Sequence, residues 1–252
     1  MNKDISNLMK EWEYDPATVN ARHIVGADGA QRIQLRLDLG ILQLERTGRP
    51  DGTRPRGYDT LLDYFTMCAG TSKGRFRLTP DDCSELQSEA TQFYYRYISS
   101  LSLKDYETVI RDTQHNLELF EFVEAHAEDP DMAWEFIQFK PYLLMMQTRA
   151  RSEEAAAAKD FAEASCVVMR GLEEIWAFWE EQEEPEFKTD SYEVDVLTKL
   201  LETYISERPL NQADELKEKL HYAIKSEDYE RAARLRDELK AMTRSKVEES
   251  IA

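Results

Sequence analysis

The sequence is poor in residues that break helices and in residues that build sheets. Its 252 residues include only 9 glycines and 8 prolines, while valine, isoleucine and threonine rarely cluster. Leucine, glutamate, alanine, lysine and arginine dominate instead, and these residues favour helix, whereas β-branched residues favour strands. We therefore expect an all-α fold, with no sheet.

Cysteines and long apolar runs are also scarce. The three cysteines, Cys68, Cys83 and Cys166, are far apart and form no Cys-x-x-Cys pair, so we expect reduced thiols rather than a zinc or dithiol site. No stretch approaches the about 18 apolar residues of a membrane-spanning helix, and the first residues lack the basic and apolar regions of a secretory signal. We expect a cytoplasmic protein without membrane contact.

Positive charge is the third shortage. Lysine and arginine total 32 against 50 acidic residues, which gives a net charge of -18. The imbalance is uneven: residues 20–80 hold ten basic and six acidic residues, whereas residues 115–195 hold six and twenty-one. Nucleic-acid binding depends on clustered cations that displace counterions from phosphates, so the composition disfavours a nucleic-acid partner outside a local basic site.

The N-terminal part of the chain gives an ambiguous pattern. We expect residues 1–30 to be mobile and residues 31–206 to form the main helical domain. Apolar residues alternate strictly from Ile33 to Leu39, which fits a strand as well as a helix. The 17 residues from 31 to 47 contain no turn signal, and this length favours a buried helix, with Gly40 allowing close contact with a neighbour.

Two loops carry the basic residues of this part. Residues 48–57 combine three glycines and two prolines with Arg49, Arg54 and Arg56, and cannot continue a regular element. These arginines are candidates for contact with an anion or a partner, and a plain solvated connector is the alternative reading. The loop at residues 70–80 adds three more basic residues, Lys73, Arg75 and Arg77.

Between and after the two loops the pattern indicates helices, most of them long and antiparallel. We expect helices over 58–68, 82–101, 105–126, 132–158, 160–182 and 192–206. Thr79 or Asp81 can cap the second of these, with Pro80 suited to its first turn. The aromatic groups at 93–97 and 176–179 fit a core, although exposed members could line a groove for a basic peptide.

A short pattern recurs three times, at residues 104–117, 159–172 and 227–240. Each copy places Asp-Tyr or Asp-Phe where a second helix would begin. The aspartate can cap that helix, while the aromatic ring packs back across the turn. The first two copies resemble tetratricopeptide hairpins, although their spacing of 55 residues departs from the usual ~34. The repeat predicts stacked helical hairpins.

The most specific pattern lies in residues 211–242, before a tail of residues 243–252. The segment reads as two short helices joined by a turn. The small residues at 232 and 233 in the second helix permit a close approach of the first, and Tyr229 can pack over the end of the pair where the turn lies. Each half has apolar residues at helical spacing, so that two short helices would face each other with one apolar stripe each: Leu216, Leu220 and Ala223 on the first, and Ala232, Leu235 and Leu239 on the second.

This segment resembles the UVR motif, a helical hairpin shared by UvrB and UvrC of nucleotide excision repair and by several regulators and adaptors of Clp proteases. In that family the hairpin pairs with a similar hairpin on a partner. The resemblance therefore implies association with another protein or self-association, and docking on the chain's own helical domain is the alternative. The protein-binding residues that it implies are Leu216, Leu220, Ala223, Tyr229, Ala232, Ala233, Leu235, Arg236 and Leu239.

The sequence offers no positive sign of catalysis. It lacks helicase, nuclease and phosphate-binding Gly-Lys-Ser/Thr motifs. It has one Glu-x-x-His, Glu218 to His221, whereas a di-iron bundle needs two such motifs and two further carboxylates. We identify no catalytic, metal or cofactor site and expect a non-enzymatic adaptor or scaffold, in Clp-type proteolysis or DNA repair. The alternative is a repair or stress factor that contacts DNA or RNA through its arginine-rich loops.

Overall fold

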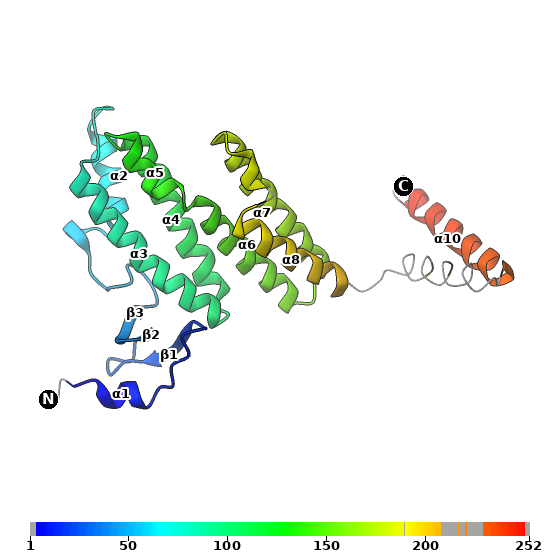
Figure 1. Ribbon diagram of the computed structural model, residues 1–252, viewed down its shortest axis with the longest axis horizontal. Coiled ribbons are helices and arrows are strands. Elements are labelled where there is room, and N and C mark those ends of the chain that lie inside the picture. Colours follow the sequence, from blue (N-terminus) through cyan, green and yellow to red (C-terminus); the bar gives the residue numbers. More distant parts are fainter. Residues whose placement is uncertain (1–3, 189, 208–215, 217–219, 221–228, 250–252) are drawn as a thin grey trace. The chain divides into compact units, whose positions relative to one another are not determined.

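The chain forms two compact units, Met1–Ile205 and Ser206–Ala252. The computed structural model describes residues 4–188, 190–207, 216, 220 and 229–249. The described residues are mostly helical, with a small three-stranded sheet in the larger unit (Figure 1). The helical fold class predicted from the sequence is confirmed.

The sheet is the main departure from the prediction. Its strands, β1 (Asn20–Val25), β2 (Gln31–Leu37) and β3 (Gly40–Glu45), pair antiparallel in the order β1-β2-β3. The helix expected over residues 31–47 is therefore wrong, because the alternation of apolar and polar residues is that of a half-buried strand. Residues 38 and 39 form a two-residue turn that contains no glycine, and Leu39 is 94% exposed there.

The sheet also extends into residues that were expected to be mobile. Strand β1 belongs to the first 30 residues, and its pairing with β2 joins His23 to Ile33. One face of the sheet is buried through Ile33, Leu35 and Leu44. Contacts between α3 and both β1 and β2 place this face against the helical part of the unit.

The helices agree closely with the expected ranges. Thr79 caps α3 through its hydroxyl, with Asp82 completing a capping box and Pro80 in the first turn. The described α-helices up to the boundary between the two units are α1 (Ser6–Lys10), α2 (Leu61–Thr71), α3 (Pro80–Ser102), α4 (Tyr106–His126), α5 (Pro130–Ile137), α6 (Lys140–Ala157), α7 (Phe161–Glu181) and α8 (Tyr192–Glu207).

One expected helix is divided in two. Residues 132–158 were predicted to be continuous, but α5 ends at Ile137 and α6 begins at Lys140, with Pro141 in its first turn. Proline has no N–H to bond the carbonyl four residues earlier, and it disfavours helical geometry in the residue before it. The break leaves Phe139 between the helices, with 51% of its surface exposed.

The recurring sequence pattern produces the same turn at its first two copies. Lys104 and Lys159 both adopt a left-handed backbone, with φ of 59° and 63°. The following aspartates, Asp105 and Asp160, cap α4 and α7 by accepting a backbone N–H three residues on. The third aspartate, Asp228, lies outside the described residues, and α10 (Tyr229–Glu249) begins directly after it.

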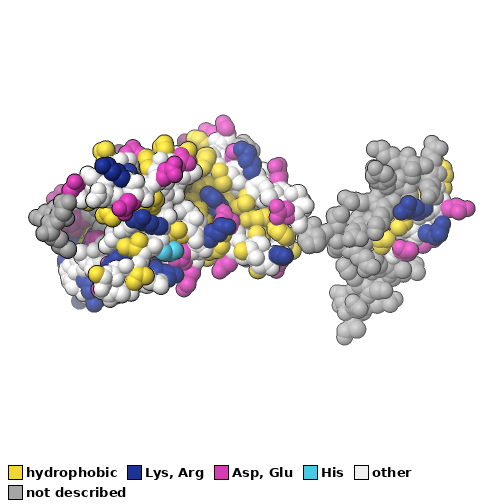
Figure 2. Space-filling view, turned by 90° about the horizontal axis from the view of Figure 1, so that it is seen from below, with side chains coloured by type: hydrophobic (Ala, Val, Ile, Leu, Met, Phe, Trp, Pro, Cys, Tyr) yellow, Lys and Arg dark blue, Asp and Glu magenta, His cyan; other side chains and the backbone are white. Residues whose placement is uncertain are grey.

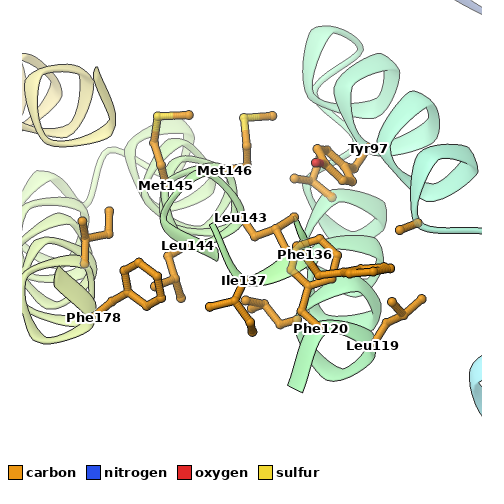
Figure 3. Close-up of a cluster of buried hydrophobic side chains, with 14 of the residues drawn as sticks. Tyr97, Leu119, Phe120, Phe136, Ile137, Leu143, Leu144, Met145, Met146 and Phe178 are labelled. Carbon is orange, nitrogen blue, oxygen red and sulfur yellow. The ribbon is translucent and has the colours of Figure 1, made fainter. Parts of the chain in front are cut away.

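Successive helices pack on one another along the chain. Helix α3 lies against α4, α4 against α6, and α6 against α7, with the pairs α3/α4 and α6/α7 antiparallel (Figure 1). Figure 3 shows the side chains between them, with Phe120 and Phe136 beside Leu143 and with Phe178 near Leu144. Among the described residues, no helix is long and apolar enough to cross a membrane.

A buried polar network fixes the sheet to this helical core. The guanidinium of Arg96 donates two hydrogen bonds to the carboxylate of Asp112, at 2.6 and 2.9 Å, and both side chains are fully buried. Its remaining nitrogen donates to the carbonyls of Glu45 and Gly48. Arg96 thus joins α3 and α4 to the end of β3 and the loop after it.

Candidate protein-binding surfaces

The smaller unit contains the predicted hairpin residues as one apolar cluster. Leu216, Ala232 and Leu235 are buried together, with Leu220 and Leu239 packed against them. The two stripes read from the sequence therefore meet in the described part of the unit. Ala223, and residues 225–228 where the sequence places the turn between the two helices, lie outside the described residues.

The other predicted hairpin residues are more exposed. Tyr229 is 69% exposed at the start of α10, whereas the equivalent rings of the earlier repeats, Tyr106 and Phe161, pack partly buried against the main core. Ala233 is half-buried, and Arg236 is exposed and donates to Asp237, its neighbour in sequence, at 2.9 Å. Tyr229 and Arg236 therefore face solvent in this unit.

The hairpin core is small for an independent fold. Five apolar side chains form its described cluster. Chains below about 40 residues usually need a disulfide, a metal or association to be stable, and no cysteine lies beyond Cys166 in this sequence. Further burial against another surface would supply the missing stabilisation.

The arginines of the loop at 48–57 are each paired with carboxylates. Arg49 is largely buried and its guanidinium lies 3.1 Å from Glu89 and 3.2 Å from Asp51. Arg54 pairs with Asp59 at 2.8 Å and Arg56 with Glu85 at 2.7 Å. Arg56 also lies over the ring of Tyr64, 4.7 Å from its centroid.

Glu89 explains why Arg49 is held inside. Its fully buried carboxylate accepts the backbone N–H groups of Leu61 and Leu62 at the start of α2. A carboxylate is favoured there by the positive end of the helix dipole. Arg49 is therefore part of the packing between the loop, α2 and α3, rather than a free cation.

The second basic loop is more open. Lys73, Arg75 and Arg77 are all exposed, and Arg77 donates to the neighbouring carbonyl of Phe76 at 2.7 Å. The structure does not gather the six basic residues of the two loops into one patch of free cations, because those of the first loop are neutralised by carboxylates.

The aromatic group at 93–97 divides between core and surface. Phe93 is buried and its ring stacks on His115 with centroids 3.8 Å apart, and Tyr97 is buried as well. Tyr94 is partly exposed and its ring meets that of Tyr97 edge-on, 5.5 Å away. In the second group, Phe178 belongs to the core, while Trp176 is exposed and donates to the carbonyl of Lys188.

Tyr94 and Tyr97 line a pocket, of which the sequence indicated only that exposed aromatic residues could form a groove. The pocket has a volume of about 470 Å³. Its lining comes from four helices: Gln87, Ala90, Thr91, Tyr94 and Tyr97 of α3, Asn116 and Phe120 of α4, Glu135 and Phe136 of α5, and Leu143 and Tyr142 of α6, with Phe139 at the break. In the sequence, Pro141 was the residue that could have indicated the pocket, because it accompanies the break between α5 and α6.

The pocket is apolar with a few polar groups. Burial raises the pKa of Tyr142 to about 12 and also raises the pKa of Tyr97, so both phenols are neutral near pH 7. Hydrophobic side chains lie in patches among charged ones on the face that Figure 2 shows of the larger unit. Among the described residues, no group of three or more His, Cys, Asp or Glu side chains could hold a metal ion.

Comparison with known families identifies one part of the chain. Residues 211–243 match the UvrB/uvrC motif, called UVR, which confirms the resemblance read from residues 211–242. Proteins with this motif include UvrB, UvrC and related proteins of DNA repair or protein interaction. Comparisons of the chain with curated proteins and with solved structures gave no match.

Proposed function

We propose that this protein is a non-enzymatic adaptor of the cytoplasm, in which the C-terminal hairpin binds another protein or a second copy and the larger helical unit binds a different protein. The observation that carries the proposal is the hairpin cluster of Leu216, Leu220, Ala232, Leu235 and Leu239. A hairpin with so small a core is stabilised when another hairpin covers it.

The separation of the chain into two units supports a bivalent mechanism. The hairpin belongs to the unit Ser206–Ala252, and the pocket belongs to the unit Met1–Ile205. Linking two binding modules raises the effective concentration of the second partner once the first is bound. The setting would be Clp-type proteolysis or nucleotide excision repair, where UVR hairpins of related proteins act.

The alternative function, contact with DNA or RNA through the loops, has less support. Arg49, Arg54 and Arg56 each lie within 3.2 Å of a carboxylate oxygen. A phosphate would have to displace these partners, and the net charge of -18 opposes its approach.

The hairpin proposal is tested with a double substitution, Leu220→Asp and Leu235→Asp, in the full chain. We expect the variant to lose the partner captured by affinity purification from the native cell, or to lose self-association in analytical ultracentrifugation, because two charges enter the apolar cluster. Circular dichroism checks that the larger unit keeps its helical signal and its thermal transition.

A matched control carries Arg234→Ala and Lys240→Ala, which change the net charge by the same amount and leave the cluster intact. Both residues are exposed on α10. The control is expected to keep the partner and the association state. If the double aspartate variant keeps both as well, the hairpin is not the recruiting element and the proposal is wrong.

A further inference from the structure

The pocket of the larger unit has the size and shape of a ligand site. Its volume is about 470 Å³, and ligand pockets in proteins usually hold ~300–1,000 Å³. Helices α3, α4, α5 and α6 contribute its lining, and α4 packs against the other three. Figure 3 shows Phe120, Phe136 and Leu143 close together, with Tyr97 beside them.

A buried acceptor without a partner lies in this lining. Asn116 is 2% exposed, and its Nδ2 donates to the carbonyl of Ala90 at 3.0 Å. A carbonyl only accepts hydrogen bonds, so the amide is oriented with its Oδ1 elsewhere. That Oδ1 is buried and accepts no hydrogen bond, and buried polar groups are rarely left in this state. A donor from a ligand would satisfy it.

The charges around the pocket indicate which kind of ligand group would bind there. Among the residues that the structure describes, Glu135 is the carboxylate in the lining, and no lysine, arginine or histidine is part of it. Two charged residues influence Tyr142 from nearby, Arg149 and Glu193, and Arg149 donates to Glu153 at 3.2 Å. Glu135 therefore gives the lining a negative charge, which suits a cation.

The aromatic walls narrow the choice further. Tyr94, Tyr97, Phe136, Phe139 and Tyr142 all line the pocket, and aromatic faces attract cations. A guanidinium stacks flat on such rings, is more weakly hydrated than an ammonium, and carries five N–H donors in a planar fork. It therefore gives up less hydration than lysine on entering an apolar pocket.

We propose that this pocket binds the side chain of an arginine in an extended segment of a partner protein, with the guanidinium between the rings, donating to Oδ1 of Asn116 and to Glu135. This inference rests on the proposed function, since it names the chemistry of the partner that the larger unit recruits. The acidic character of the chain favours a segment that is basic overall.

The test uses the full chain and four pools of fluorescein-labelled heptapeptides. The central residue is arginine, lysine, citrulline or leucine, and the flanking positions mix glycine, alanine, serine and leucine, so that no single flanking sequence decides the result. Anisotropy at about 150 mM salt should show saturable binding of the arginine pool, at least about tenfold tighter than the citrulline pool, with the lysine pool between them.

Three substitutions locate the binding. Phe139→Ala and Glu135→Gln alter exposed residues, and each should weaken binding of the arginine pool about tenfold, while Asn116→Leu should remove the preference for arginine over leucine. Trp134→Ala and Glu128→Gln are the matched controls, because both residues are exposed and line a different pocket. The controls should bind as the unchanged chain does.

Three results would overturn the proposal: equal binding of the arginine and citrulline pools, no saturable binding of the arginine pool, or full binding by both Phe139→Ala and Glu135→Gln. The variant Leu220→Asp, Leu235→Asp separates the two proposals. It should bind the arginine pool normally, so loss of peptide binding and loss of hairpin association are recorded independently.

Discussion

At the scale of single residues, the larger unit depends on charges held away from water. Arg96 and Asp112 are both fully buried, and removing two ions from water costs several kcal/mol each. Hydrogen bonds offset this cost, because the guanidinium of Arg96 donates to both carboxylate oxygens of Asp112 and to the carbonyls of Glu45 and Gly48. Loss of Arg96 would leave the buried carboxylate of Asp112 with the half-exposed Arg111, and loss of Asp112 would remove the carboxylate that the buried guanidinium of Arg96 bonds.

Replacing Arg96 with leucine should therefore lower the free energy of unfolding by about 3–5 kcal/mol. The measurement is equilibrium urea denaturation followed by circular dichroism. Arg111→Leu is the matched comparison, because Arg111 bonds the same carboxylate of Asp112 at 3.0 Å but is 43% exposed, and partly exposed ion pairs contribute about 0–1 kcal/mol. Equal losses in the two variants would contradict this account of Arg96.

The residues that the sequence could assign are those with local roles. Thr79 caps α3, and Asp105 and Asp160 cap α4 and α7, because capping depends on a few neighbouring residues. Arg49 also pairs with Glu89 of α3, and Arg96 bonds the carbonyl of Glu45. These partners are distant in sequence, and the spacing of residues does not show such contacts. The sequence therefore leaves two readings of the loop arginines, contact with an anion or a partner and a plain solvated connector, and does not show the buried packing of Arg49.

At the scale of elements, helix positions were predicted well and the sheet was not. The helical stripes span several turns and give a strong periodic signal, whereas β2 and β3 together span residues 31–45 with a turn lacking glycine or proline. The short alternation of apolar and polar residues favours a strand, but the lack of a turn signal over 17 residues favoured a helix in the prediction. The sequence indicated an aromatic groove but not the walls that α5 and α6 contribute, since these depend on the break before Pro141.

Helices α6 and α7 approach closely at Gly171. A Cβ at this position would collide with the side chain of Thr148. Although alanine is the better helix former by about 1 kcal/mol, Gly171→Ala should destabilise the unit by about 1–3 kcal/mol because the core would be overpacked. Urea denaturation measures the change, and adding Thr148→Ala should restore part of the loss.

Gly70 provides the matched control for this prediction. It lies in α2, and a Cβ there would meet nothing within 4 Å. Gly70→Ala should leave stability unchanged or raise it by up to about 1 kcal/mol. If both alanine variants behave alike, the close approach of α6 and α7 does not limit the size of residue 171.

At the scale of the whole molecule, charge and division into units decide which partners are compatible. Acidic residues exceed basic ones by 18, and the arginines of the first loop are engaged with carboxylates. A surface of this kind repels phosphates and attracts basic segments of proteins. The adaptor proposal and the arginine pocket are both consistent with this distribution.

The full chain should consequently show no binding to a duplex DNA of mixed sequence at about 150 mM salt. Any retention at low salt should fall steeply as salt is added and should be unchanged by Arg54→Ala. Electrophoretic mobility shift over a salt series is the measurement. Binding that persists at physiological salt and weakens on substitution of Arg54 or Arg56 would instead support the nucleic-acid function.

The identical turns at Lys104 and Lys159 constrain how the length of this chain can change. Inserting or deleting one residue at the start of the second helix would rotate its apolar face by about 100° relative to the turn and carry that face away from its partner. Length can vary instead in the connections between pairs, such as the segment between α4 and α5. Chains of this architecture should therefore diverge by gaining or losing complete helical pairs, while the turns within pairs keep a constant length.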